Sequence, residues 1–338
     1  MLGGKMENSG AYSCIFSPPL KCKDTPIQIE NPSDLTYSKL IKANYAEKEF
    51  LVATRISKIP LWKQYFVISE SICSPAKQTD DLSKCDVLDD LSNFKILQMP
   101  FGGIPFNRYV FNLKTFDFMA FVQHLIEAGS LLNLFGIVHR DIHKGNILIK
   151  DDVPRIIDYN LSIFVGDNTP VPRHIYNLVP YQEPPDSTVV NGVSWGYKPE
   201  RIIESVILKK PIIKQIVNIL NVSQDDMIKS LQLFYYTHKD VKASDNTEWF
   251  KNYWRTIDSW AIGVNIIHLI HNFSLSPEFS KGLNKNKLFP MLRKMCAVSP
   301  NERIDCVQAL NYLDPTNFII RKYAKSWLNR VGTGNIRI

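Results

Sequence analysis

Short apolar runs and helical stripes alternate along this chain, with turn residues between them. Apolar runs bounded by glycine, proline or aspartate predict strands over 96–103, 147–149 and 155–157. Apolar residues at helical spacing predict helices that include 131–135, closed by a glycine at position 136, and 258–264. In the middle of the chain the pattern therefore predicts a helix, a polar loop and a strand pair in succession.

The segment 205–250 carries two further helical patterns. Its apolar residues recur at helical spacing over 212–220 and 227–236. We expect these helices to pack on the larger part of the molecule, and the alternative is a docking surface for a partner. The stretch 21–34 is expected to be a surface loop that lengthens an early strand connection.

The polar loop at 139–146 carries most of the candidate chemistry. Its sequence is His-Arg-Asp-Ile-His-Lys-Gly-Asn, and Asp158, flanked by apolar residues, follows twelve residues after Asn146. Phosphoryl transfer from ATP needs one carboxylate to orient an attacking hydroxyl, and oxygen ligands to hold magnesium over the phosphates. Asp141 fits the first role, and Asn146 and Asp158 fit the second.

With a predicted helix before it and a predicted strand pair and Asp158 after it, this loop resembles the catalytic loop of the protein-kinase superfamily. The resemblance covers about residues 8–312 and implies an α+β, bilobal fold. A small antiparallel β-sheet lobe would occupy 1–100, and a larger, mainly helical lobe would occupy 101–338. The 338 residues and 45% hydrophobic content suffice for two such lobes without a further folded module. The chain is most similar to the divergent serine/threonine kinases of nucleocytoplasmic large DNA viruses.

A segment near the amino terminus resembles the loop that covers the nucleotide phosphates. Its central glycine, aromatic and apolar positions are in register, while Asn8 and Ser13 replace two glycines. Small residues let backbone amides approach a phosphate closely. The residues assigned to the nucleotide here are Asn8, Ser9, Gly10, Ala11, Tyr12, Ser13 and Ile15.

The strand around Lys39 resembles the one whose lysine contacts the nucleotide phosphates and pairs with a glutamate on the next helix. Glu47 is predicted as that partner, because Phe50 and Leu51, three and four positions on, would dock the same helix face. The alternatives are Glu49 for the carboxylate and Lys42 for the lysine.

The strand at 96–103 resembles the hinge that binds adenine, with its glycine pair as the turn. Leu97, Gln98 and Met99 are the residues that this resemblance assigns to the nucleotide.

Two late motifs resemble the end of the activation segment and the helix that follows it. The first is Trp195-Gly-Tyr-Lys-Pro-Glu200, and the second begins at Asp258. The resemblance implies that Asp258 holds the backbone of the catalytic loop and that Arg303 forms a buried ion pair with Glu200.

The activation segment also bears on acceptor choice and regulation. Ser194 would lie near Asp141, which indicates serine/threonine specificity. Arg140 would order the segment by binding an acidic or phosphorylated group. The candidate hydroxyls are those of Thr169, Tyr176, Tyr181, Ser187 and Thr188.

Two departures from the family pattern lie inside the site. His143 stands where these kinases place a lysine that contacts the transferred phosphate, and Lys144 follows it, so both are assigned to catalysis. Tyr159 and Asn160 replace the usual Phe-Gly pair. Asparagine tolerates left-handed backbone angles, which would preserve the turn.

The resemblance implies an ATP- and magnesium-dependent enzyme that phosphorylates serine or threonine of protein substrates. A small-molecule kinase is the alternative, because the loop also resembles the Asp-Leu-His-Pro-Gly-Asn pattern of aminoglycoside and choline kinases. Those enzymes lack counterparts of Glu200, Asp258 and Arg303, which favours a protein acceptor. A pseudokinase scaffold is the further alternative, because the phosphate loop lacks two glycines.

Charge and hydropathy limit the other partners. The net charge of +7 comes from 40 basic and 33 acidic residues, and the tail 321–338 has five basic residues and no acidic one. Without aromatic interleaving or a binding motif, this excess does not predict nucleic-acid binding. An apolar run of eighteen residues is missing, so no membrane association is expected.

Cysteine and histidine spacing complete the expectations. The six cysteines show no Cys-x-x-Cys pair, which predicts free thiols and an intracellular protein. For a viral protein the compartment would be the host cytoplasm, with packaging in the virion as an open alternative. His268 and His271 are expected to pack on their helix rather than to bind a metal.

Overall fold

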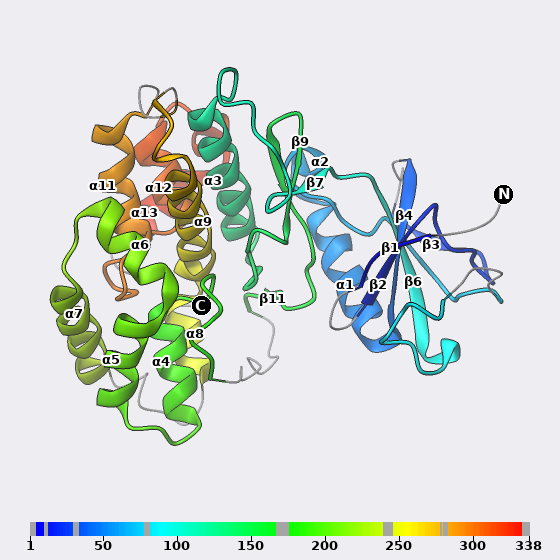
Figure 1. Cartoon of the computed structure of the whole chain (residues 1–338), viewed down its shortest axis with the longest axis horizontal. Coiled ribbons are helices and arrows are strands. Elements are labelled where there is room, and N and C mark those ends of the chain that lie inside the picture. Colours follow the sequence, from blue (N-terminus) through cyan, green and yellow to red (C-terminus); the bar gives the residue numbers. More distant parts are fainter. Residues whose placement is uncertain are drawn as a thin grey trace. The chain divides into compact units, whose positions relative to one another are not determined.

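The computed structural model describes residues 5–9, 13–29, 34–77, 82–166, 176–238, 246–277, 279 and 283–332. The structure is mixed α+β and divides into two compact units (Figure 1). Unit 1 comprises Met1–Pro105, Leu148–Lys150 and Arg155–Asn160, and unit 2 comprises Phe106–Ile147, Asp151–Pro154 and Leu161–Ile338. The first division thus falls at residue 105, beyond the lobe boundary predicted at 100, and unit 1 gains two later segments.

A six-stranded sheet is the frame of unit 1. Its strand order is β1-β2-β4-β6-β5-β3, and all of its pairs are antiparallel. The strands are β1 (Lys5–Ser9), β2 (Ser13–Ser17), β3 (Ile27–Gln28), β4 (Leu35–Lys42), β5 (Ser71–Cys73) and β6 (Phe94–Pro100). Because β3 pairs with β5, the predicted loop at 21–34 contributes an exposed edge strand to the sheet.

Side chains on β4 alternate between the two faces of this sheet. Leu40 belongs to one apolar cluster, whereas Ile41 packs with Leu97 beneath helix α1 (Ala43–Ile56). Lys39 lies directly opposite Leu97 on β6, so its side chain projects to the α1 face. Unit 1 also contains the short helices α2 (Trp62–Tyr65) and η1 (Leu91–Asn93).

Two disulfides close the other face of the sheet. Cys14 of β2 is bonded to Cys85, and Cys22 is bonded to Cys73 of β5. The expectation of free thiols is therefore wrong for four of the six cysteines, because the fold brings together residues that are 71 and 51 positions apart. The free cysteines, both buried in unit 2, are Cys296 and Cys306.

Reduction of these disulfides is expected to destabilise unit 1. Each crosslink restricts the unfolded chain, and loops of this length contribute roughly 4 kcal/mol on the chain-entropy model. Thermal unfolding followed with and without reductant should give a lower Tm in reductant. A variant with all four cysteines replaced by serine should show no such shift. Thiol titration in denaturant should find two free thiols, and six would contradict the crosslinks.

Unit 2 is mainly helical and has two long buried helices, α3 (Phe118–Leu134) and α9 (Ile257–Phe273). Most of their side chains are buried, as expected for helices in a core. Gly136 adopts a left-handed φ of +64° just after α3, so the predicted glycine stop is confirmed. The other regular helices are α4 (Pro185–Ser194), α5 (Pro199–Lys209), α6 (Pro211–Leu220), α7 (Gln224–Thr237), α8 (Asn246–Tyr253), α11 (Lys285–Met295), α12 (Cys306–Leu313) and α13 (Lys325–Gly332).

Shorter elements complete the chain. A three-stranded sheet has the order β10-β9-β7, and a two-stranded sheet pairs β11 with β8. The two predicted strands around an Asp-Asp turn are confirmed as β9 and β10. These elements are β7 (Ile104–Pro105), β8 (Ile137–Val138), β9 (Ile147–Lys150), β10 (Val153–Ile156), β11 (Ile163–Phe164), η3 (Trp254–Thr256) and the π-helical η4 (Ile320–Ala324).

The segment 205–250 forms the two helices that its pattern predicts, α6 and α7. Ile213 and Ile216 are buried on α6, which packs against α9, and Leu231 and Phe234 are buried on α7. Their packing within unit 2 is therefore confirmed. Within the described ranges, no helix is long and apolar enough to cross a membrane.

Candidate active site

The Lys39 ammonium lies between two carboxylates in unit 1. Its Nζ is 2.8 Å from Glu49 Oε2 and 3.1 Å from Asp158 Oδ1. Lys39 and Glu49 are each 4% exposed, whereas the Asp158 side chain is 36% exposed. Burial alone would lower the pKa of Lys39, but the charges of Glu49 and Asp158 outweigh it and raise that pKa. The lysine is therefore a fixed, protonated cation.

The prediction that Glu47 pairs with Lys39 is wrong, and Glu49 is the partner. The buried face of α1 is formed by Ala46, Glu49, Val52, Ala53 and Ile56. Glu47 lies off that face and is exposed, as is Leu51, at 52%. The alternative lysine, Lys42, forms an exposed ion pair with Asp89.

Replacing Glu49 by glutamine is expected to lower the stability of unit 1, because it removes one partner of a buried charge. Such losses cost roughly 3–5 kcal/mol, and the remaining contact to Asp158 places the expected loss of unfolding free energy at about 3 kcal/mol. Denaturant unfolding of this variant should be compared with that of Glu47→Gln on the same helix. The Glu47 variant should unfold like the wild type. Equal midpoints for both variants would contradict the assignment.

Asp158 is held in a left-handed backbone conformation, with φ of +65°. The sequence predicts that Asn160 adopts the left-handed conformation that makes this turn. That prediction is wrong, because Asp158 adopts it instead. The following Tyr159 is 1% exposed and donates a hydrogen bond to Ile156 O at 2.7 Å. A non-glycine residue in this conformation is held there by its surroundings, a feature that clusters at functional sites.

The predicted phosphate loop is described only in part. Asn8 and Ser9 belong to β1, Ser13 begins β2, and Ile15 is half-buried opposite Asn8. Gly10, Ala11 and Tyr12 lie outside the described residues.

The predicted hinge residues lie in β6. Leu97 is fully buried beside Lys39, and Gln98 Oε1 accepts a hydrogen bond from Ser71 Oγ at 2.7 Å. Met99 packs at the edge of the Leu97 cluster. The predicted glycine turn follows, since Gly103 has a φ of +127° and a Cβ there would lie 2.4 Å from Ile149 O.

In unit 2, both carboxylate oxygens of Asp141 have defined neighbours. Oδ1 accepts a hydrogen bond from Gln182 Nε2 at 2.7 Å, and Oδ2 accepts one from Asn146 Nδ2 at 3.2 Å. His143 Nε2 lies 3.7 Å from Oδ2. A carboxylate oriented in this way can still accept a hydrogen bond from a substrate hydroxyl, because each oxygen has two lone pairs.

Asn146 has the geometry of a residue that locks a loop and retains a free ligand atom. Its Nδ2 also donates to the Asp141 carbonyl at 3.0 Å, and the residue is 7% exposed. Among the described residues, none donates a hydrogen bond to Asn146 Oδ1. That amide oxygen in unit 2 is a hard oxygen donor of the kind that magnesium prefers, and so, in unit 1, is the exposed Asp158 carboxylate.

The side chains of His143 and Lys144 have different surroundings. His143 Nδ1 accepts a hydrogen bond from Gly145 N at 2.9 Å, so the neutral ring carries its proton on Nε2, the atom nearest Asp141. A Cβ on Gly145 would lie 2.7 Å from the His143 ring, which explains the glycine. Lys144 instead lines a pocket with Phe106. His143 is therefore the better candidate to contact a transferred phosphate.

Asp258 anchors the catalytic loop as predicted. Its carboxylate accepts hydrogen bonds from His139 N at 2.7 Å and Arg140 N at 2.9 Å. Asn265, also on α9, donates to Ile142 O at 2.9 Å. The loop backbone is thus fixed from one buried helix.

Arg140 lies among carboxylates. Burial lowers the pKa of Arg140 to about 10, against the opposing charges of Glu183, Asp258 and Asp141. Glu183 thus supplies an acidic group of the kind expected to face this arginine.

Two consecutive residues also hold the loop: Tyr181, which the sequence suggested only as a candidate phosphorylation site, and Gln182, which sequence reasoning missed. Tyr181 Oη accepts a hydrogen bond from Lys144 N at 2.7 Å, and the next residue, Gln182, binds Asp141. Trp260 Nε1 in turn donates to Tyr181 O at 2.9 Å. No local pattern in the sequence distinguishes these residues.

The Ser194 hydroxyl donates a hydrogen bond to Asn191 O at the end of α4. The side chains that donate to the Asp141 carboxylate are those of Gln182 and Asn146. Serine/threonine specificity therefore has no support from Ser194.

The predicted ion pair between Arg303 and Glu200 is also wrong. Arg303 Nη2 lies 2.6 Å from Asp186 Oδ1, and both side chains are fully buried. Glu200 is exposed and accepts a hydrogen bond from Tyr236. The signal was available, because Pro185-Asp186 is also a proline followed by an acid, closer to the catalytic loop in sequence.

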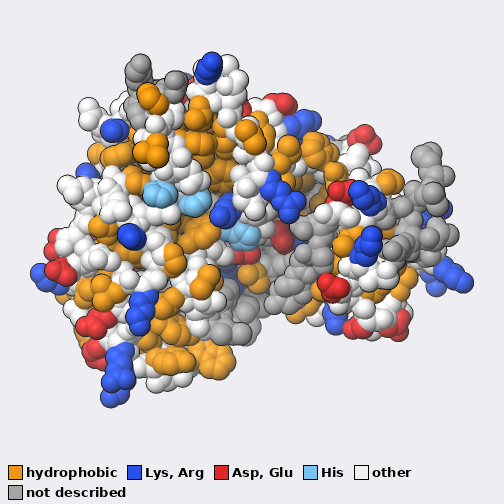
Figure 2. Space-filling model, in the orientation of Figure 1, with side chains coloured by type: hydrophobic (Ala, Val, Ile, Leu, Met, Phe, Trp, Pro, Cys, Tyr) orange, Lys and Arg blue, Asp and Glu red, His pale blue; other side chains and the backbone are white. Residues whose placement is uncertain are grey.

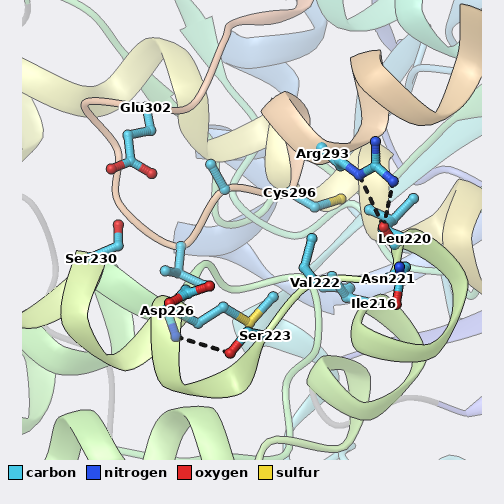
Figure 3. A pocket seen from close by; sticks show the side chains of 13 residues that line it. Ile216, Leu220, Asn221, Val222, Ser223, Asp226, Ser230, Arg293, Cys296 and Glu302 are labelled. Carbon is cyan, nitrogen blue, oxygen red and sulfur yellow. Dashed lines mark hydrogen bonds between the residues drawn. The ribbon is translucent and has the colours of Figure 1, made fainter.

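A second pocket, of about 560 Å³, lies where α6, α7 and α11 meet (Figure 3). Asp226 and Glu302 line one side, and Arg293 on the other side donates two hydrogen bonds to Leu220 O. The segment 205–250 thus carries a concave surface with carboxylates at its edge.

Among the described residues, no three His, Cys, Asp or Glu side chains form a metal-binding group. No protein-family model matches the chain, and no curated protein matches it.

Proposed function

We propose that this chain is an ATP-dependent protein kinase that transfers the γ-phosphate to serine or threonine hydroxyls. The observation that carries the proposal is the buried Lys39 ammonium, fixed by carboxylates 10 and 119 residues away in sequence. In protein kinases, a strand lysine held by a glutamate positions the nucleotide phosphates. Under this proposal, units 1 and 2 are the two lobes of a kinase-like fold.

The roles of the described residues follow from their contacts. Lys39 would bind the nucleotide phosphates, with Glu49 holding its ammonium in place. Asp141, oriented by Asn146 and Gln182, would accept the hydrogen bond of the substrate hydroxyl and take its proton as the phosphate is transferred.

Magnesium would be held by Asn146 Oδ1 and the Asp158 carboxylate. When bound, this ion neutralises charge that develops on the phosphate oxygens. His143 Nε2–H would donate to the transferred phosphate, the task that the neighbouring Lys144 leaves open by facing a pocket.

A protein acceptor is favoured over a small molecule by Asp258 and Arg303. Asp258 anchors the catalytic loop, and Arg303 forms a buried ion pair with Asp186 in place of the predicted Glu200. Aminoglycoside and choline kinases lack both a loop-anchoring aspartate like Asp258 and a late arginine like Arg303. A pseudokinase scaffold is disfavoured because Lys39, Asp141, Asn146 and Asp158 are all present.

The proposal includes the wider expectations of the resemblance. The chain would be an enzyme of a large DNA virus that acts in the host cell. The two disulfides of unit 1 remove the free thiols on which the expectation of an intracellular protein rested. The acidic pocket on the 205–250 segment would be its docking site for a protein partner.

Transfer of labelled phosphate tests the proposal. Purified protein would be incubated with magnesium and γ-labelled ATP in the presence of casein or myelin basic protein. Wild type should label the acceptor, and Asp158→Ala should abolish labelling without unfolding the protein. ATP binding without transfer to any acceptor would refute the kinase and favour a scaffold.

A further inference from the structure

A small pocket in unit 2 opens beside the catalytic loop and has no role in the transfer step itself. Its volume is about 170 Å³, similar to that of one side chain. The polar residues that line it are Asn107, Tyr109, Lys144, His268 and Asn272. None of the described lining residues is acidic.

The remaining wall is aromatic and closely packed. Phe111 meets Phe106 and Phe273 edge to face, with ring centroids 6.1 Å and 5.6 Å apart. Apolar walls exclude water from the side of a bound group, which strengthens its interaction with a nearby charge. The pocket therefore suits one charged group that enters from solvent.

The pocket has an unbalanced positive charge. Lys144 Nζ has no hydrogen-bond or ion-pair partner among the described residues. Burial lowers the pKa of His268, and the positive charges of Lys144 and His271 lower it further. Figure 2 shows a face on which histidine side chains lie next to lysine or arginine and hydrophobic side chains.

The same short segment fixes both this pocket and the catalytic carboxylate. The Tyr181 ring stacks on that of His268, with centroids 6.4 Å apart and an interplanar angle of 17°, and its hydroxyl accepts from Lys144 N. The next residue, Gln182, binds Asp141. Because Lys144 is three residues from Asp141, their Cα atoms are at most about 11 Å apart.

We propose that this pocket is an acceptor subsite that binds an acidic side chain of the protein substrate. An extended peptide advances about 3.3 Å per residue, so the acidic residue would lie within about three or four residues of the phosphorylated hydroxyl. Lys144 would supply the charge, and the side-chain amides of the two asparagines would supply hydrogen-bond donors. The inference rests on the proposed kinase function and defines its substrate class.

Peptide substrates test the subsite directly. A serine in an alanine background would be paired with a single glutamate placed at each position from −4 to +4. We expect one position to raise kcat/KM by about tenfold over the neutral peptide, as a charge-assisted hydrogen bond would. Phosphoserine at that position, compared with glutamate, distinguishes a phosphate from a carboxylate as the preferred anion.

Charge reversal provides the decisive comparison. Lys144→Glu should abolish the glutamate preference and favour lysine at the same position. Asn272→Asp should weaken the preference without altering the loop. Lys209→Glu, on the exposed face of α5, should keep the wild-type ratio.

The outcomes separate the two proposals. A wild type that phosphorylates all peptides equally, or a preference that survives Lys144→Glu in a folded variant, would overturn the subsite. Failure to phosphorylate any peptide or protein, neutral ones included, would instead refute the kinase, and the subsite with it.

Discussion

Asp141→Asn is expected to reduce phosphate transfer by about 10²–10⁴-fold, the range that general acid–base catalysis contributes. Asparagine retains an oxygen for the Gln182 hydrogen bond but cannot take the proton of the acceptor hydroxyl. The loss should appear in kcat, while the KM for ATP changes little, because Asp141 is assigned to the acceptor. Initial rates with a protein acceptor at saturating ATP measure the effect.

A matched variant controls for the loss of one negative charge. Asp225→Asn alters an exposed carboxylate on α7 of the same unit and should leave the rate unchanged. If Asp141→Asn retained more than half of the wild-type rate, the assignment of Asp141 as the base would be wrong.

Asp186→Asn is expected to destabilise unit 2 by roughly 3–5 kcal/mol, because it leaves the Arg303 charge buried without its carboxylate. Asp186 Oδ2 also accepts a hydrogen bond from Trp249 Nε1 at 3.1 Å, so two contacts to this side chain are weakened. For a unit of this size the Tm should fall by roughly 10 °C. Scanning calorimetry or circular dichroism at neutral pH measures it.

The control is a substitution at Glu200, the residue that the sequence predicts as the partner of Arg303. Glu200→Gln changes an exposed carboxylate and should leave the Tm near that of the wild type. A larger loss of Tm for Glu200→Gln than for Asp186→Asn would restore the ion pair that sequence reasoning predicted.

Local elements of this fold could be predicted because their signals are local. Periodicity located α6 and α7, and Gly136 marked the end of α3 because only a residue that tolerates positive φ suits that position. The residues 139–146 and Asp158 could be singled out from their types and spacing alone.

Long-range partners could not be predicted in the same way. Glu47 and Glu49 differ by about 200° around α1, so the choice depends on the helix rotation that the sheet imposes. The partner of Arg303 could not be predicted because two proline–acid pairs, Pro185-Asp186 and Pro199-Glu200, were available, and only tertiary packing places the first beside Arg303. The Cys14–Cys85 disulfide depends on tertiary packing that brings both residues into one apolar cluster, a contact that no sequence spacing reveals.

The acceptor of the labelled phosphate tests the central claim most directly. The protein would be incubated with magnesium and γ-labelled ATP alongside casein, choline and an aminoglycoside, and labelled protein would be hydrolysed for phosphoamino-acid analysis. The account predicts phosphoserine or phosphothreonine in the protein and no label in the small molecules. Label in choline or the aminoglycoside, with none in protein, would contradict it.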